Sequence, residues 1–126
     1  MKLLASHDHT PPAEGDARVV ALANDADPLA LPLEGVERID LHFPNFTDGR
    51  AYSQAYLLRR RRRFAGDIRA TGDVLIDQLV QMARTGFSSA VLKEGVDAAD
   101  AQRQFDRFPG FYQGDVAHQP HFKAAA

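Results

Sequence analysis

Two short polar turns contain the residues of this sequence whose types and spacing could do chemistry. Each turn combines threonine, aspartate and glycine after an apolar run, and each has an arginine beside it. The residues concerned are Thr47, Asp48, Arg50, Arg69, Thr71 and Asp73. Arginine binds oxyanions through paired hydrogen bonds, and the free N–H groups at a helix N-terminus favour negative charge. If the two turns lie side by side, they predict a site for a small anion or a phosphate-bearing ligand.

A structural interpretation of the same turns remains open. Aspartate and threonine are frequent helix N-caps, because their side-chain oxygens accept hydrogen bonds from the free N–H groups of the first turn. Thr47 or Asp48 could cap the first helix in this way, and Asp73 is expected to be the N-cap of the second. The two arginines would then pair with the aspartates instead of with a ligand.

A run of five arginines is the second feature of interest. It consists of Arg59, Arg60, Arg61, Arg62 and Arg63. Five consecutive positions cover more than one helical turn, so these side chains cannot all lie on one face. The run could be a docking patch for an acidic protein surface or for phosphates. Alternatively, it is a solvated helix end, where positive charge interacts favourably with the helix dipole.

The histidines give little support for a metal site. Four of the five fall in terminal regions that we expect to be flexible. No spacing within the predicted elements resembles a zinc site, so we expect no bound metal. The fifth, His42, follows Asp40 on the polar side of a predicted strand. A general-base role and a structural role are both conceivable for it.

Composition argues against several classes of function. The 126 residues hold 15 basic and 17 acidic side chains, and the net charge of -2 gives no reason to expect nucleic acid or a membrane as a partner. Cysteine is absent, which excludes disulfides, thiolate nucleophiles and cysteine-ligated iron–sulfur clusters. No dinucleotide-binding or P-loop glycine motif is present, so no cofactor is evident. We see neither an apolar leader nor a membrane-spanning stretch, and expect a cytoplasmic protein.

The elements that must position these residues alternate between strand and helix. Strands are predicted at residues 19–23, 36–43, 67–70, 87–92 and 111–113, and an edge strand or extended loop at 29–33. Helices are predicted at 49–63, at 73–85 and from 97 to 105 or 108. This order predicts an α/β fold with a small, mostly parallel sheet built from successive βα units, as an open sheet or a partial barrel.

The domain organisation follows from the same reading. We expect one α/β domain over residues 18–115, with flexible tails at residues 1–17 and 116–126. An open sheet edge would favour self-association as a homo-oligomer, because unpaired strand edges invite partners.

The two turns also resemble a known family. The segments F-P-N-F-T-D-G-R-A-Y-S-Q-A and R-A-T-G-D-V-L-I-D-Q-L are similar to the bacterial domain of unknown function family 934. The resemblance covers about residues 39–92 and is weaker through 112–113. The matching positions are Phe43, Pro44, Phe46, Thr47, Asp48, Gly49, Arg50, Tyr52, Ser53, Gln54, Arg69, Thr71, Gly72, Asp73, Asp77 and Gln78. The arginine run and Asn45, where lysine is familiar, depart from the family pattern.

What the resemblance implies about function comes from the family's gene neighbourhood. Its members are commonly described as oxidoreductases involved in sulfite reduction, because their genes tend to neighbour that of sulfite reductase. The absence of cysteine and of a dinucleotide motif favours an accessory role over an enzyme that carries electrons alone. We therefore expect an accessory protein of assimilatory sulfite reduction, which binds sulfite reductase or a small oxyanion such as sulfite or sulfate.

Two alternatives remain. The first is an enzyme that acts on a small anionic substrate, with Asp48 or Asp73 as base and Arg50 and Arg69 as clamp. The second is a structural or regulatory protein with another partner.

Overall fold

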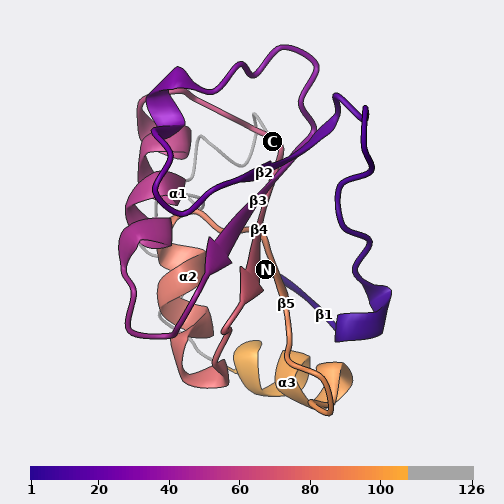
Figure 1. Cartoon of the computed structure of the whole chain (residues 1–126). Helices are drawn as coiled ribbons and strands as arrows, with labels where there is room; N and C mark the ends of the chain where they lie inside the picture. Colours follow the sequence, from indigo (N-terminus) through magenta and orange to yellow (C-terminus); the bar gives the residue numbers. More distant parts are fainter. Residues whose placement is uncertain (108–126) are drawn as a thin grey trace.

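Five parallel strands form an open sheet at the centre of the computed structural model, which describes residues 1–107 (Figure 1). The strands are β1 (Lys2–Leu4), β2 (Val19–Leu22), β3 (Arg38–Phe43), β4 (Asp67–Gly72) and β5 (Ser89–Val91). Their order across the sheet is β1-β5-β4-β3-β2, and every neighbouring pair is parallel. The α/β fold expected from the sequence is confirmed, and of the two expected forms the sheet takes the open one.

Helices connect the central strands and cover one face of the sheet. The helices are α1 (Arg50–Arg60), α2 (Leu79–Thr85) and α3 (Ala98–Phe105), with 3-10 turns at Ser6–Asp8, Pro28–Ala30 and Ile76–Gln78. Helices α1 and α2 lie together on the left of the sheet in Figure 1. Helix α3 packs beside β1, where Gln102 Oε1 accepts a hydrogen bond from the N–H of Leu3 at 3.0 Å. This contact satisfies an N–H group on the outer edge of the sheet.

The side chains of β3 show how the two faces of the sheet differ. Ile39, Leu41 and Phe43 are completely buried in the hydrophobic core. Because successive side chains of a strand point to opposite faces, Asp40 and His42 lie on the other face. The strict alternation in the sequence therefore separates an apolar, helix-covered face from a polar one.

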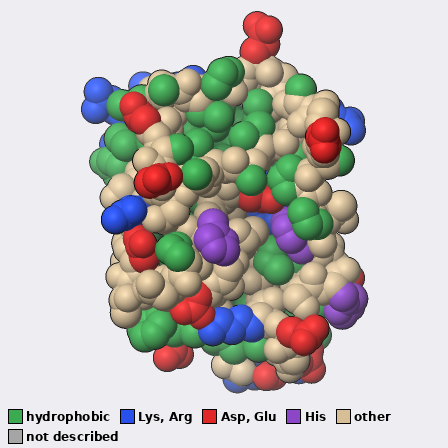
Figure 2. Space-filling model, viewed as in Figure 1, with side chains coloured by type: hydrophobic (Ala, Val, Ile, Leu, Met, Phe, Trp, Pro, Cys, Tyr) green, Lys and Arg blue, Asp and Glu red, His purple; other side chains and the backbone are tan. Residues whose placement is uncertain are grey.

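The N-terminal segment (residues 5–18) passes over the polar face. Arg38 Nη2 donates to the carbonyl oxygen of Thr10 at 2.7 Å, and Arg69 Nη1 donates to His9 Nδ1 at 3.1 Å. Figure 2 shows histidine side chains on either side of a hollow, with acidic and basic side chains inside it. Parallel sheets usually have both faces covered, and here a chain segment contributes to the second cover.

The expectation of a flexible tail over residues 1–17 is wrong for its first residues. Lys2–Leu4 form strand β1, which pairs with β5. Leu3 and Leu4 are buried, so even three residues add apolar surface to the core. The expected C-terminal tail at 116–126 and the strand at 111–113 lie outside the described residues. Within residues 1–107, no helix has the length and apolar character needed to cross a membrane.

Helix α1 ends three residues earlier than expected. The next two N–H groups both donate to the carbonyl oxygen of Leu57, and Arg63 adopts a left-handed φ of 58°. This turn brings Phe64 back to the core, where it is buried. The arginine run is therefore split between a helix end and a tight turn.

Helix α2 begins later than expected, so Asp73 is not its N-cap. Residues 74–75 are extended or irregular, and a 3-10 turn precedes the first helical residue, Leu79. The N–H of Asp73 donates to the carbonyl oxygen of Phe43 at 2.8 Å, which prolongs the contact between β3 and β4. The helix ends as expected at Gly86, whose φ is 126°. A Cβ atom there would lie 2.7 Å from Arg59 Cγ, so glycine is required for packing as well as for conformation.

Candidate functional site

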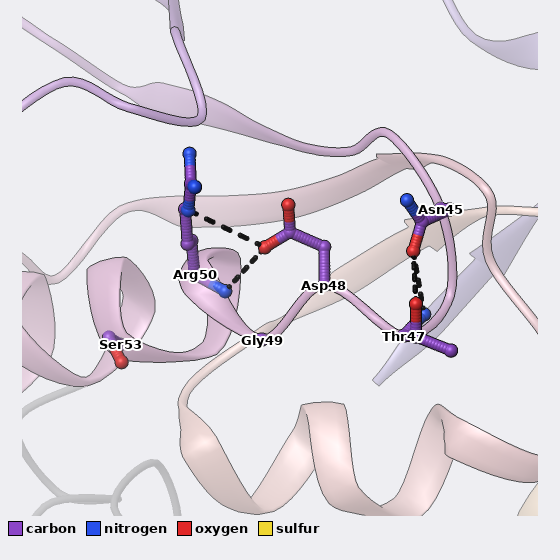
Figure 3. Close-up of a pocket in the computed structure, with 6 residues that line it drawn as sticks. All are labelled: Asn45, Thr47, Asp48, Gly49, Arg50 and Ser53. Carbon is purple, nitrogen blue, oxygen red and sulfur yellow. Dashed lines mark hydrogen bonds and ion pairs between the residues drawn. The ribbon is translucent and has the colours of Figure 1, made fainter.

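The first polar turn forms an open shelf beyond the C-terminal end of β3, which we call the turn shelf. It is a shallow depression of about 540 Å³. Its lining residues are Asn45, Thr47, Asp48, Gly49, Arg50 and Ser53 (Figure 3). All of them belong to one segment that leads from β3 into α1, so the local sequence alone builds the shelf.

Asp48 and Arg50 are the charged residues of the turn shelf. Asp48 Oδ1 accepts a hydrogen bond from the N–H of Arg50 at 3.0 Å, although Gly49 occupies the N-cap position. The same oxygen lies 4.0 Å from Arg50 Nε, and the Arg50 side chain is 67% exposed. Figure 3 shows the guanidinium group extending outward beside the carboxylate. Its outer N–H donors are therefore accessible to an oxyanion.

Hydroxyl groups lie at either end of the turn shelf. Asn45 Oδ1 accepts two hydrogen bonds from Thr47, one from its hydroxyl group at 2.5 Å and one from its backbone N–H at 3.1 Å. Ser53 lies on the first turn of α1 and is exposed. The Thr47 hydroxyl thus stabilises the turn, while the Ser53 hydroxyl is accessible at the rim.

Asp73 joins the two polar turns. Its Oδ2 accepts a hydrogen bond from the N–H of Phe46 at 2.7 Å, and its Oδ1 forms an ion pair with Lys93, which follows β5. Gln78 Nε2 also connects the turns, because it donates a hydrogen bond to the carbonyl oxygen of Phe46 at 3.0 Å. The hydrogen bond from Lys93 lowers the pKa of Asp73, and the Phe46 N–H acts in the same direction. The two turns do lie side by side, with an ionised carboxylate holding them together.

Arg69 does not reach the turn shelf. It lies opposite Asp40 in the sheet, three residues before the end of β4, and three residues of strand span about 10 Å. Its guanidinium group donates to Ser89 Oγ at 3.0 Å, to Asp67 Oδ2 at 3.2 Å and to His9 Nδ1 at 3.1 Å. The expected clamp of two arginines is therefore not formed, because Arg69 is engaged on the polar face of the sheet.

A second cavity, which we call the sheet-face cleft, lies on that polar face. Its volume is about 450 Å³. Polar lining comes from His9, Asp40, His42 and Thr71, and apolar lining comes from the two prolines that follow Thr10 and from the end of β2. These residues come from the N-terminal segment and three strands, so only the fold brings them together.

Asp40 and His9 form the most enclosed polar part of the sheet-face cleft. Asp40 is 4% exposed and accepts two hydrogen bonds from Arg38, from Nε at 2.8 Å and from Nη2 at 3.0 Å. His9 Nε2 lies 3.8 Å from Asp40 Oδ2. Since arginine can only donate, His9 Nδ1 must accept from Arg69, and the proton of the neutral imidazole is on Nε2. Burial lowers the pKa of His9, and the nearby Arg38 and Arg69 add to this effect, against the opposing charge of Asp40.

His42 and Thr71 form the outer rim of the sheet-face cleft. His42 Nδ1 lies 3.3 Å from Thr71 Oγ1, and the imidazole is exposed. The strands approach closely here because residue 72 is glycine: a Cβ atom on it would lie 2.4 Å from the carbonyl oxygen of Phe43 and 2.6 Å from His42 Cε1. Thr71, which the sequence assigns to the second polar turn, therefore lies in β4 and faces the sheet-face cleft.

The arginine run is divided between internal and exposed side chains. Arg59 donates to the carbonyl oxygens of Gly86, Phe64 and Gly66 at 2.8, 2.9 and 2.7 Å. Burial lowers the pKa of Arg59 to about 10, so it remains charged at neutral pH. Arg62 donates to two backbone carbonyls in residues 28–31, both at 2.8 Å. Only Arg60, Arg61 and Arg63 are exposed, and these three remain available for docking.

The sequence does not predict the roles of two residues in the hydrogen-bond network around the sheet-face cleft. His9 falls in the segment for which the sequence predicts a flexible tail, and nothing in its neighbourhood shows periodicity. The sequence indicates Asp67 only as the start of a strand, yet its carboxylate accepts hydrogen bonds from Ser88, Ser89 and Arg69. The available signal was the polar alternation in β3 and β4, which is unusual for a parallel sheet.

Comparisons with known proteins identify a family for the chain but no activity. A family model described as a bacterial protein of unknown function (DUF934) matches residues 19–122. No curated protein and no solved structure matches the chain. The matched region includes the turn shelf and the strands of the sheet-face cleft, and it begins after His9.

Proposed function

This chain belongs to DUF934, a family of bacterial proteins of unknown function, and we propose that it is a cytoplasmic accessory protein of assimilatory sulfite reduction that binds a small oxyanion at the turn shelf. The resemblance in the two turns motivates the link to sulfite reduction. Oxyanion binding is supported by the exposed guanidinium group of Arg50 at the start of an 11-residue helix. Charge and forked geometry suit this group to sulfite or sulfate.

The environment of Arg50 supports binding of modest strength. The Asp48 carboxylate is 4.0 Å away, which is too far for a tight hydrogen bond but close enough to compete with an anion. The Ser53 hydroxyl and the dipole of α1 favour negative charge in the same depression. We therefore expect reversible binding that depends strongly on ionic strength.

The same observations favour an accessory role over an enzyme acting at the turns. Asp73, one of the two expected bases, is paired with Lys93, and its lowered pKa makes it a weak proton acceptor. Asp48 is engaged with the start of α1. With Arg69 held elsewhere, a catalytic clamp would have to rely on Arg50 alone.

Docking to sulfite reductase would use the exposed arginines. Arg60, Arg61 and Arg63 lie at the end of α1, opposite the helix end that carries the turn shelf. Arg60 also lies over the ring of Tyr56, which is itself 45% exposed. A cationic surface with an exposed aromatic ring fits an acidic protein surface.

Titration calorimetry with sulfite and sulfate tests the oxyanion part of the proposal. We expect Arg50→Gln to weaken binding at least tenfold, which corresponds to the loss of about one charge-assisted hydrogen bond. Arg18→Gln is a matched control, because Arg18 is also exposed, at 69%, and also pairs with an aspartate. Equal binding by both variants, or no binding by the unmodified chain at low salt, would refute the site.

A binding assay with purified assimilatory sulfite reductase from the same host tests the partner. The triple variant Arg60→Gln, Arg61→Gln and Arg63→Gln should lose binding at low and moderate salt. A triple variant of three other exposed arginines, Arg18→Gln, Arg103→Gln and Arg107→Gln, removes the same charge and should retain it. If both triple variants bind like the unmodified chain, the arginine surface is not the docking site. If the unmodified chain does not bind, docking to sulfite reductase is overturned, and the accessory role then depends on oxyanion binding alone.

A further inference from the structure

We propose that the sheet-face cleft is a second binding site, separate from the turn shelf, for an uncharged, flat heterocycle that carries an N–H group next to a C=O group. The inference rests on the unsatisfied hydrogen-bonding groups of the cleft, on its charge balance and on its apolar walls. It does not depend on the proposed role in sulfite reduction.

Asp40 supplies a fixed hydrogen-bond acceptor. Its carboxylate is 4% exposed and is held in place by Arg38, which donates once to each oxygen. A carboxylate oxygen has room for two hydrogen bonds, so each oxygen can accept one more. Because the side chain is nearly buried and held by Arg38, this acceptor is available to a ligand without conformational rearrangement.

His9 supplies a donor beside that acceptor. Its Nδ1 accepts from Arg69, which leaves the proton on Nε2. Nε2 lies 3.8 Å from Asp40 Oδ2, beyond hydrogen-bond distance. The cleft therefore presents one donor and one acceptor next to each other, neither satisfied by the other. An amide edge within a ring, with its N–H and C=O on neighbouring atoms, complements this pair.

The charges around the cleft favour an uncharged ligand. Arg38 is paired with Asp40, and Arg69 is paired with Asp67, so the four charges cancel. An anion would be repelled by the open acceptor side of Asp40, and an ammonium group would meet the N–H of His9. A neutral group with both a donor and an acceptor avoids both penalties.

The walls of the cleft fit a flat, largely apolar body. Pro11, Pro12 and Leu22 line it together with two alanines at the end of β2. The volume of about 450 Å³ lies within the usual range for small-molecule sites. His42, at the rim, can stack on a ring or hydrogen-bond to a substituent through Nε2. Histidine side chains flank the hollow of this face in Figure 2.

Histidine-detected NMR of the full chain tests the proposal directly. The probes are uracil, hypoxanthine and 2-pyridone, each compared at millimolar concentration with the counterpart in which every N–H next to a C=O is methylated: 1,3-dimethyluracil, 1-methylhypoxanthine and N-methyl-2-pyridone. We expect at least one N–H form to shift the imidazole signals of His9 and His42. Methylation of that compound should weaken binding about tenfold, because one hydrogen bond to a carboxylate is lost.

Two variants separate the proposed hydrogen bonds from simple apolar binding. His9→Phe keeps an aromatic ring but removes the donor, and it should weaken binding of the N–H probe as measured on the His42 signal. His42→Ala removes the stacking group at the rim but keeps the donor and the acceptor, so it should weaken binding less than His9→Phe does, and saturating probe should still shift the His9 signal. Circular dichroism establishes that each variant is folded.

Several outcomes would overturn the inference. It fails if no N–H probe shifts either histidine, if the methylated probes bind equally well, or if His9→Phe binds as tightly as the unmodified chain. Sulfate, added as a separate probe, should leave the His9 signal unchanged; a saturable shift by sulfate would show that the cleft is an anion site. Because the readout is at His9 and His42, failure here is distinguishable from failure of oxyanion binding at Arg50.

Discussion

The turn shelf and the sheet-face cleft are built from similar side chains in opposite ways. The shelf takes its six lining residues from one short segment, residues 45–53, and its key charge, Arg50, is 67% exposed. The cleft takes its lining from the N-terminal segment and strands β2, β3 and β4, and its key charge, Asp40, is 4% exposed. Both contain an arginine–aspartate pair, yet one pair is loose and solvated while the other is fixed at 2.8 and 3.0 Å.

This difference determines what each pair can do. An exposed ion pair contributes little to stability, so the Arg50 guanidinium can exchange Asp48 for a ligand at low cost. A buried pair must remain intact, because a lone buried charge is costly. The shelf is therefore suited to reversible anion binding, and the cleft to holding a fixed pattern of donors and acceptors.

The largest effect is expected from breaking the buried pair. Asp40→Ala leaves the Arg38 guanidinium without its main acceptor, and we expect a loss of about 3 kcal/mol in the free energy of unfolding. Asp48→Ala, the matched change in the turn shelf, should cost about 1 kcal/mol or less, mainly through the lost hydrogen bond at the start of α1. Urea denaturation measures both. Equal losses would show that burial does not distinguish the two pairs.

A similar contrast exists inside the arginine run. Arg59→Leu keeps an apolar stem but removes the donors to three backbone carbonyls, which should cost about 2 kcal/mol. Arg60→Leu removes a neighbouring exposed guanidinium and should change stability by less than about 0.5 kcal/mol. Thermal and urea unfolding of the two variants provide the comparison. If Arg59→Leu is as stable as Arg60→Leu, the backbone contacts of Arg59 do not stabilise the fold.

The sequence predicted the strand and the helix start on either side of the shelf, because local patterns determine them. The alternation in Val36–Phe43 identified β3, and the turn chemistry after Pro44 identified the start of α1 within one residue. The parallel βα order then placed the second turn beside the first, where Asp73 indeed contacts Phe46. Strand periodicity and turn propensity were sufficient for these features.

The cleft could be predicted only in part, because it depends on contacts distant in sequence. The alternation in D-I-R-A-T puts Arg69 on the same side as Asp67 and Thr71, and this pattern was visible. Arg69 lies three residues before the end of β4, which is too far for its side chain to belong to the turn as the sequence predicts. The contact with His9 joins residues 60 positions apart, and no local pattern in the N-terminal segment indicates it.

The pH dependence of stability should also distinguish the two regions. The pKa of His9 is lowered in the folded state by burial and by the facing Arg38 and Arg69, against Asp40. Below pH 6.5 the His9 side chain takes up a proton in the unfolded chain more readily than in the folded chain. The free energy of unfolding is therefore highest above pH 6.5 and decreases as the pH falls through the folded-state pKa of His9. Asp73 also has a lowered pKa, but its contribution is lost only below pH 3.8. Urea titrations from pH 7 to 5 should show a decline that His9→Phe reduces and Asp73→Asn does not.

The smallest effect on stability is expected at Arg50, and that is what makes it informative. Its side chain is largely exposed, and its ion pair with Asp48 is long, at 4.0 Å. Arg50→Gln and Arg50→Lys should therefore each change the free energy of unfolding by less than about 0.5 kcal/mol. Oxyanion affinity should nevertheless fall in the order arginine, lysine, glutamine, because lysine keeps the charge but loses the two-pronged donor. Urea denaturation and calorimetry with sulfite on the same samples separate the two quantities. A stability loss as large as that of Asp40→Ala would instead place Arg50 among the structural arginines, and the contrast between a binding shelf and a fixed cleft would then disappear.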